Sequence, residues 1–485
     1  MGNLSGICLR VYFSKDFSAA DFIIANSALL QLFTEQSEEV SDNAGSIRYA
    51  HLCRTNVETA LLNLPLHLPA TMDSISALLL GAFHTMEISK PSLCWTLSSK
   101  ASELSQTLGY HRIPCTREGF VSEKDRHGQL FFWFTYFIDK SLSLRLGRAS
   151  TIQDWDITTP MVVGPGTPSL IDVSIIMWIN TARCQGKIYE NLYSPDAIMQ
   201  PDHVRKSRIQ DISGDLQKLE QEACNIKNNY SEARDTLSHR LIQYMGLSDD
   251  VLRLSLLTLV YRASPTSPGS PSVFIPDCLE AARAALQRHQ DFVNTFADVS
   301  SNYFTSYIHW TLLFAPFTPF IVLFCHIIES PQVEQDDLNR LDSFVTSISA
   351  VAPTLSDAAS KMHRLFEVLS KIAQRYTIYR SSPLGQEQAP AEQANLNIYL
   401  TALGFQPMNQ DNHQQQSTDF PSVPSQDVTI GNGNYNNMMG VDGEAETLPT
   451  AWIGHTTELG QWFEGNQHMM NVLEGQDAVD FSFLD

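Results

Sequence analysis

The chain has 485 residues, and its 43% hydrophobic and 10% aromatic residues are enough to build a large buried core. The net charge is −21, and residues 381–485 hold 14 acidic residues and no Lys or Arg. A negative field repels phosphate, which disfavours direct DNA binding by this chain alone. The composition therefore predicts a globular body at residues 1–380 and an acidic tail at residues 381–485.

Apolar residues recur at three- and four-residue spacing through the body, which is typical of amphipathic helices. Residues 91–109 begin with a proline suited to a first helical turn and end at Gly109, which can form a left-handed cap. The apolar stripe of this segment consists of Leu93, Leu97, Ala101, Leu104 and Leu108. Residues 126–146 form the most aromatic helix, and Gly147 is its predicted terminator.

The same spacing predicts further helices along the rest of the body. These are residues 171–193, 209–226, 251–261, 277–296, 338–351 and 357–376. Strand-like alternation is almost absent. The sequence therefore predicts an all-α, multi-helical body.

One uncharged run, residues 303–328, has the length of a membrane span. Two prolines, Pro316 and Pro319, and two histidines, His309 and His326, count against a span. No basic cluster flanks the run to set an orientation. We expect a buried core helix broken at the prolines, and no membrane association.

No motif in the sequence indicates catalysis or a bound cofactor. The eight cysteines are scattered without a C-x-x-C pair, which favours reduced core residues over a zinc site. Phosphate-binding loops, nucleophile elbows and metalloprotease motifs are missing from the sequence. We therefore predict no enzyme, no metal and no cofactor in this chain.

The tail is rich in Gln, Asn, Gly and Pro, and we expect it to be disordered because it can bury little apolar area. Near its end, bulky apolar residues alternate with carboxylates. These residues are Trp462, Phe463, Phe481, Phe483 and Leu484. The pattern is typical of an acidic-hydrophobic activation segment that contacts a coactivator. The alternative is a flexible tail without a partner.

Residues 123–160 form a distinctive block, EKDRHGQLFFWFTYFIDKSLSLRLGRASTIQDWDITTP. Gly147 can end the helix, and Arg148 can then project toward acids such as Asp139, Asp154 or Asp156. We favour a structural ion network for these four residues, because buried charges are normally paired. A ligand-binding or catalytic site is the alternative.

The same block resembles the middle homology region of fungal zinc-cluster transcription factors. The residues that carry this resemblance and form the family motif are Trp133, Tyr136, Asp139, Leu146, Gly147, Arg148, Asp154, Asp156 and Pro160. Residues 22–33 and 101–112 resemble two earlier helices of that region. Ala149 departs from the pattern, since the family usually has proline there.

The resemblance implies a nuclear transcription regulator that controls a metabolic or secondary-metabolite gene set. Zinc is expected only in the family's N-terminal six-cysteine cluster, which this chain starts too late to contain. DNA contact is therefore expected only indirectly, or through that missing N-terminal module. The resemblance leaves open a homodimer or heterodimer and a small-molecule effector.

Three hypotheses follow. The chain is part of a zinc-cluster activator, or a regulator without its own DNA-binding module, or a helical enzyme or membrane-associated protein. An in-frame six-cysteine motif upstream, capture of a DNA-binding subunit, or turnover and membrane retention would distinguish them.

Overall fold

A computed structural model describes residues 4–39, 44–88, 90–113, 123–161, 169–230, 236–265, 274–296, 301–313, 317–330, 335–349 and 357–381. These residues form helices and connecting turns without any strand, so the predicted all-α fold is confirmed. The predicted tail lies outside the described residues, apart from Ser381 at the end of the last helix. The division at residue 381 stays a prediction.

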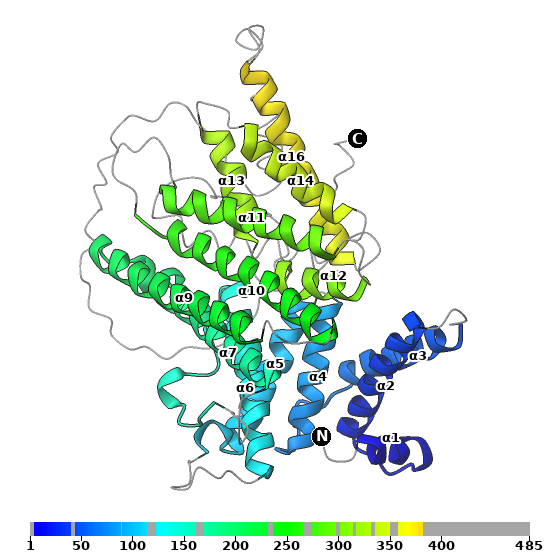
Figure 1. The fold of residues 1–485 in the computed structure, drawn as a ribbon. Helices are drawn as coiled ribbons and strands as arrows, with labels where there is room; N and C mark the ends of the chain where they lie inside the picture. The colour runs from blue at the N-terminus through cyan, green and yellow to red at the C-terminus, as the bar shows by residue number, and fades with distance from the viewer. Residues whose placement is uncertain are drawn as a thin grey trace, which may run out of the picture.

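The helices follow one another in the order shown in Figure 1. The first half contains α1 (Leu4–Phe13), α2 (Ala19–Glu39), α3 (Ala44–Leu62), α4 (Met72–Glu87), α5 (Pro91–Thr107), η1 (Tyr110–Arg112), α6 (Glu123–Leu146) and η2 (Asp154–Asp156). The middle contains α7 (Leu170–Ile188), η3 (Tyr189–Tyr193), α8 (Pro195–Ile198), α9 (Asp202–Tyr230) and α10 (Thr236–Arg262). The last part contains α11 (Pro276–Phe296), α12 (Ser301–Tyr307), η4 (Ile308–Leu312), α13 (Thr318–Glu329), α14 (Gln335–Ser349) and α16 (Asp357–Ser381).

Every helix predicted from the spacing is present, although several are longer than predicted. The segment at 209–226 belongs to α9, and the segment at 251–261 belongs to α10. Within α5, Leu97, Ala101 and Leu104 are buried, whereas Leu93 is 37% exposed and lies at the edge of the apolar stripe. Gly109 has a φ of 76°, which confirms the predicted left-handed cap.

Two clusters of buried apolar side chains hold the helices together. One is built mainly from α2 to α6, and the other mainly from α9 to α16. Figure 1 places α1 to α3 at one end of the molecule and α11, α13, α14 and α16 toward the other. Leu142 and Leu146 belong to the first cluster and Leu144 to the second, so the end of α6 joins the two.

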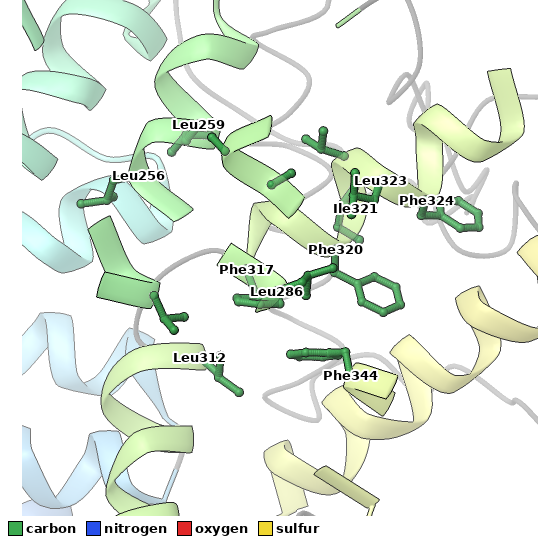
Figure 2. Packing of buried hydrophobic residues seen from close by; sticks show 14 of the residues in the cluster. Leu256, Leu259, Leu286, Leu312, Phe317, Phe320, Ile321, Leu323, Phe324 and Phe344 are labelled. Atoms are coloured by element: carbon green, nitrogen blue, oxygen red, sulfur yellow. The ribbon is translucent and has the colours of Figure 1, made fainter. Parts of the chain in front are cut away.

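The second cluster has an aromatic centre. Phe344 is 1% exposed, and its ring lies 4.8 Å from that of Phe317, 5.5 Å from that of Phe320 and 5.4 Å from that of Phe366. Figure 2 shows Phe320 and Phe344 side by side. Rings at these separations add attraction beyond their buried area. We therefore expect the stability of this half to depend strongly on Phe344.

The uncharged run at residues 303–328 is divided between α12, η4 and α13. Pro319 lies in the first turn of α13, where its missing N–H costs no helical hydrogen bond. Phe320, Val322, Leu323 and Phe324 of α13 are fully buried in the second cluster. The run is therefore divided into separate helices and α13 is buried, as predicted, although Pro319 lies inside α13 and Pro316 lies outside the described residues. Among the described helices, none is long and apolar enough to cross a bilayer.

Most of the described cysteines are buried, as expected for core residues. These are Cys53, Cys94, Cys184, Cys278 and Cys325, whereas Cys224 is exposed. Burial raises the pKa of the Cys94 and Cys278 thiols to about 12. Such thiols stay protonated at neutral pH and are poor nucleophiles.

Candidate functional site

The end of α6 forms a tight corner at Gly147. Gly147 has a φ of 62°, and the Arg148 N–H donates to the Ser143 carbonyl at 3.0 Å. The Ser143 hydroxyl donates back to the Arg148 carbonyl. This left-handed turn redirects the chain across the end of the helix, as the sequence predicted.

Asp139 fixes the loop that follows this corner. Its fully buried carboxylate accepts hydrogen bonds from the backbone N–H groups of Thr151 and Ile152 and from the hydroxyls of Ser150 and Thr151. The Thr151 N–H lies 3.1 and 3.2 Å from the two carboxylate oxygens. A buried carboxylate with this many donors is well compensated. Asp139 thus organises residues 150–152.

Asp154 and Asp156 bind side chains from the helices beneath the loop. The Tyr136 hydroxyl donates to Asp154 at 2.8 Å, and the Lys140 ammonium lies 3.4 Å from the same carboxylate. Asp156 pairs with Arg112 of η1. The ion network predicted for these two acids is therefore present.

Arg148 does not join that network, so its predicted pairing with Asp139, Asp154 or Asp156 is wrong. Its guanidinium lies over the ring of Trp95, 4.8 Å from the centroid, in a cation–π contact. The physical reason is that hydroxyl and backbone donors already surround Asp139. The arginine therefore ties the corner to α5.

The remaining motif residues are structural as well. The Trp133 indole N–H donates to the Pro160 carbonyl at 2.9 Å, and Leu146 is buried in the first cluster. None of Leu146, Gly147 and Arg148 lines the large cavity described below. These motif residues therefore determine how the loop after α6 folds. The tail residues Trp462, Phe463, Phe481, Phe483 and Leu484 lie outside the described residues.

Two glycine substitutions, one at the Gly147 corner and one in α9, should change the free energy of unfolding in opposite directions. Gly147→Ala should lower the free energy of unfolding by about 1 kcal/mol, because alanine disfavours a positive φ. Gly214→Ala, in α9 with open space around the added methyl group, should raise it by about 0.5 to 1 kcal/mol. Urea denaturation followed by circular dichroism checks both. Equal effects of the two substitutions would contradict the cap.

A cavity of about 1670 Å³ lies between the two halves of the body. On one side, α2 contributes Ile24, Ser27, Gln31 and Thr34, and α4 contributes Asp73, Ser76, Leu80, His84 and Glu87. On the other side lie residues of α10, α12 and η4. Pockets for small molecules are usually about 300–1,000 Å³ and often lie where two packed units meet. This cavity has room for such a molecule.

The wall residues of α2 and α4 follow helical spacing, so each helix turns one face to the cavity. The Thr71 side chain caps the start of α4 by accepting a hydrogen bond from the Ser74 N–H at 3.2 Å. That cap fixes where the cavity-facing residues of α4 begin.

The opposite wall contains a π-helical turn, η4. The Leu313 N–H donates to the Ile308 carbonyl at 2.8 Å, five residues earlier. The hydroxyls of Thr311 and Ser248 share a hydrogen bond of 2.6 Å, which ties η4 to α10. Single π turns inside helical segments are frequent at functional sites. Here the turn carries His309 and Trp310, which both line the cavity.

Five aromatic side chains, all partly buried, line the cavity: Phe83, Phe131, Tyr244, Tyr303 and Trp310. The Phe83 and Trp310 rings lie 5.2 Å apart and join the two walls. Tyr244 and Tyr303 form a second pair, also at 5.2 Å. The cavity thus has an aromatic lining formed by both halves of the body.

Two histidines of the lining are held neutral. Burial, with a smaller contribution from the nearby Arg145, lowers the pKa of His309 to about 4. Burial also lowers the pKa of His84, although Glu58 opposes this. The Nδ1 atoms of both rings are buried, and neither has a hydrogen-bond partner within the part of the chain that the structure describes. Such unpaired polar atoms reduce the stability of the fold, because each has lost its hydrogen bonds to water.

Carboxylates are the main charges of the cavity. Glu35, Asp73 and Glu87 line it, against the single guanidinium of Arg54 among the described lining residues. Burial raises the pKa of Glu87, and Arg54 lowers it. The lining therefore carries a surplus of negative charge.

No pattern in the sequence predicts this cavity. The helices predicted from the spacing do not include α4, and α2 is predicted only through the family resemblance. The spacing of Asp73, Ser76, Leu80, His84 and Glu87 could have revealed one face of a helix. No pattern within one segment could show that this face stays unfilled.

Residues 25–221 match the fungal specific transcription factor domain. The matched span includes the Gly147 corner and the α4 wall of the cavity. Over this span the chain carries the fungal specific transcription factor domain, and it is similar there to fungal transcription regulators. The resemblance seen in residues 123–160 is confirmed.

Several relatives are named as regulators of transcription. An uncharacterised transcriptional regulatory protein of Schizosaccharomyces pombe is 25% identical over 329 residues, which are 63% of this chain and 50% of that protein. A second one from that organism is 24% identical over 334 residues, 63% of this chain and 52% of that protein. An ABC-transporter-regulating transcription factor of Aspergillus fumigatus is 22% identical over 367 residues, 67% of this chain and 39% of that protein.

This chain therefore aligns with about half, or less, of the length of these relatives. No solved structure gives a significant match.

Proposed function

We propose that this protein regulates transcription in the nucleus and that residues 381–485 recruit the transcription machinery or a coactivator. The single observation that carries the proposal is the match of residues 25–221 to the fungal specific transcription factor domain. The separation of charge supports it, because 14 acidic residues and no basic ones follow the helical body. We assign the body a regulatory role and no catalytic one.

The target is proposed to be a metabolic or secondary-metabolite gene set. Because the net charge of −21 opposes contact with DNA phosphates, we propose that this chain reaches DNA through a partner or through an additional N-terminal module. Such a module would be the zinc cluster typical of the family. Capture of a DNA-binding subunit from nuclear extract would support the partner route.

The tail can be tested by fusing the full chain to a heterologous DNA-binding domain upstream of a reporter gene. We expect activation well above that of the DNA-binding domain alone. Changing Trp462, Phe463, Phe481 and Phe483 to alanine should reduce the output to background, because aromatic side chains provide the buried contact area in such complexes.

A matched control changes two aromatic residues of the same tail that have no neighbouring acid. Alanine at Phe405 and Tyr435 should leave the output unchanged. Equal output from the fourfold variant and the parent, at equal protein levels, would refute the role of the four aromatic residues. A parent fusion at background would refute activation by this chain.

A further inference from the structure

The cavity between the two halves of the body has the chemistry of a binding site for a positively charged molecule. Its aromatic lining and its carboxylates both attract cations, and its two buried histidines carry no charge that would repel one. We propose that the cavity binds an organic cation, a molecule with an apolar body and a protonated amine or other onium group. This inference concerns the helical body and is independent of the acidic tail.

The aromatic lining of the cavity favours binding of a cation. Aromatic faces carry partial negative charge, so a desolvated cation is attracted when it lies within about 6 Å of a ring centroid. The Phe83–Trp310 pair and the Tyr244–Tyr303 pair each have rings 5.2 Å apart. A cation with apolar substituents would contact such faces and bury its own apolar surface at the same time.

The distribution of charged side chains around the cavity also favours a cation. Arg54 lies close enough to Glu87 to lower the pKa of that carboxyl, so this acid is partly compensated. Glu35 accepts a hydrogen bond of 3.0 Å from the neutral Gln31 amide, and Asp73 lies in the first turn of α4. Neither carboxylate forms an ion pair among the described residues. An anionic metabolite would meet repulsion from both.

His84 and His309 contribute uncharged walls and not a hydrogen-bonding site, because the Nδ1 atom of each ring, which has no hydrogen-bond partner among the described residues, is itself shielded from the cavity. Both side chains are more than nine-tenths buried, and both line the cavity. Because burial and the nearby Arg145 lower the pKa of His309 to about 4, its ring carries no positive charge at physiological pH that would repel a cation.

Two ions of the same size and shape test the sign of the charge directly. Tetraphenylphosphonium and tetraphenylborate, titrated into the purified full chain by isothermal calorimetry, differ essentially in charge. We expect saturable 1:1 binding of the cation, at least about tenfold tighter than any binding of the anion. Equal affinities, tighter binding of the anion, or no saturable binding of either ion would overturn the proposal.

The net charge of −21 attracts any cation to the chain, so variants must separate the cavity from the general field. The double variant Asp73→Asn, Glu35→Gln removes two cavity carboxylates. Asp73 and Glu35 are exposed residues at the rim of the cavity, and the control Glu103→Gln, Asp211→Asn removes the same charge at equally exposed positions of α5 and α9 that do not line it. We expect the first pair to weaken phosphonium binding about tenfold and the second to change it less than twofold. Equal weakening by both pairs would contradict binding in the cavity.

Trp310→Leu provides a test that does not change the charge. It keeps an apolar side chain but removes an aromatic face, so phosphonium binding should weaken about fivefold or more while the helical circular dichroism signal stays the same. Unchanged binding would exclude the aromatic contribution. These assays measure ligand binding and the reporter assay measures activation, so failure of one proposal is distinguishable from failure of the other.

Discussion

Replacing Asp139 by alanine is expected to lower the free energy of unfolding by roughly 3 kcal/mol. The substitution removes the acceptor for two backbone N–H groups and two hydroxyls of residues 150–152. Asp139 is fully buried, so the donors that lose it cannot easily bind water instead, although the Ile152 N–H keeps the Ser150 hydroxyl as an acceptor at 3.2 Å. Urea denaturation followed by far-ultraviolet circular dichroism measures the change.

Two further variants make this test specific. Asp139→Asn keeps one oxygen acceptor but places an NH₂ group against the remaining donors. It should therefore lower the free energy of unfolding measurably, but by less than Asp139→Ala does. Asp211→Ala, at an exposed position of α9, should change stability by less than about 0.5 kcal/mol. If Asp139→Ala changed the free energy of unfolding as little as Asp211→Ala, Asp139 would not stabilise the loop at residues 150–152.

Phe344→Ala should cost roughly 3–5 kcal/mol, the usual range for removing a large buried aromatic side chain. Its ring lies against Phe317, Phe320, Phe366 and His289, and the packed neighbours can refill the space only in part. The loss is measured by the same urea denaturation, and we expect it to exceed that of any surface substitution.

Trp155 is the matched control, because it is a larger aromatic residue that is 82% exposed. Trp155→Ala should change the free energy of unfolding by less than about 0.5 kcal/mol. A similar loss for both variants would mean that the aromatic centre of the second cluster does not determine stability.

Local features could be predicted from the sequence because their cause lies within a few residues. Helical spacing identified α5, α6, α7, α11, α14 and α16, and it placed the ends at Gly109 and Gly147 where a positive φ is needed. The predicted pairing of Arg148 with a carboxylate was wrong because its partner is distant in the sequence. Its partner Trp95 comes from a different helix, and electrostatic reasoning within one block favoured a carboxylate.

The sequence by itself determined the all-α class, most of the helices, the corner that ends α6 and the resemblance to fungal transcription regulators. Only the tertiary structure decided which helical faces pack against each other and which are left around a cavity. Phe83 and Trp310 meet there from distant parts of the chain. The physical reason is that periodicity reports which residues share a face of one helix, whereas a cavity depends on where faces of several helices fail to fill the space between them.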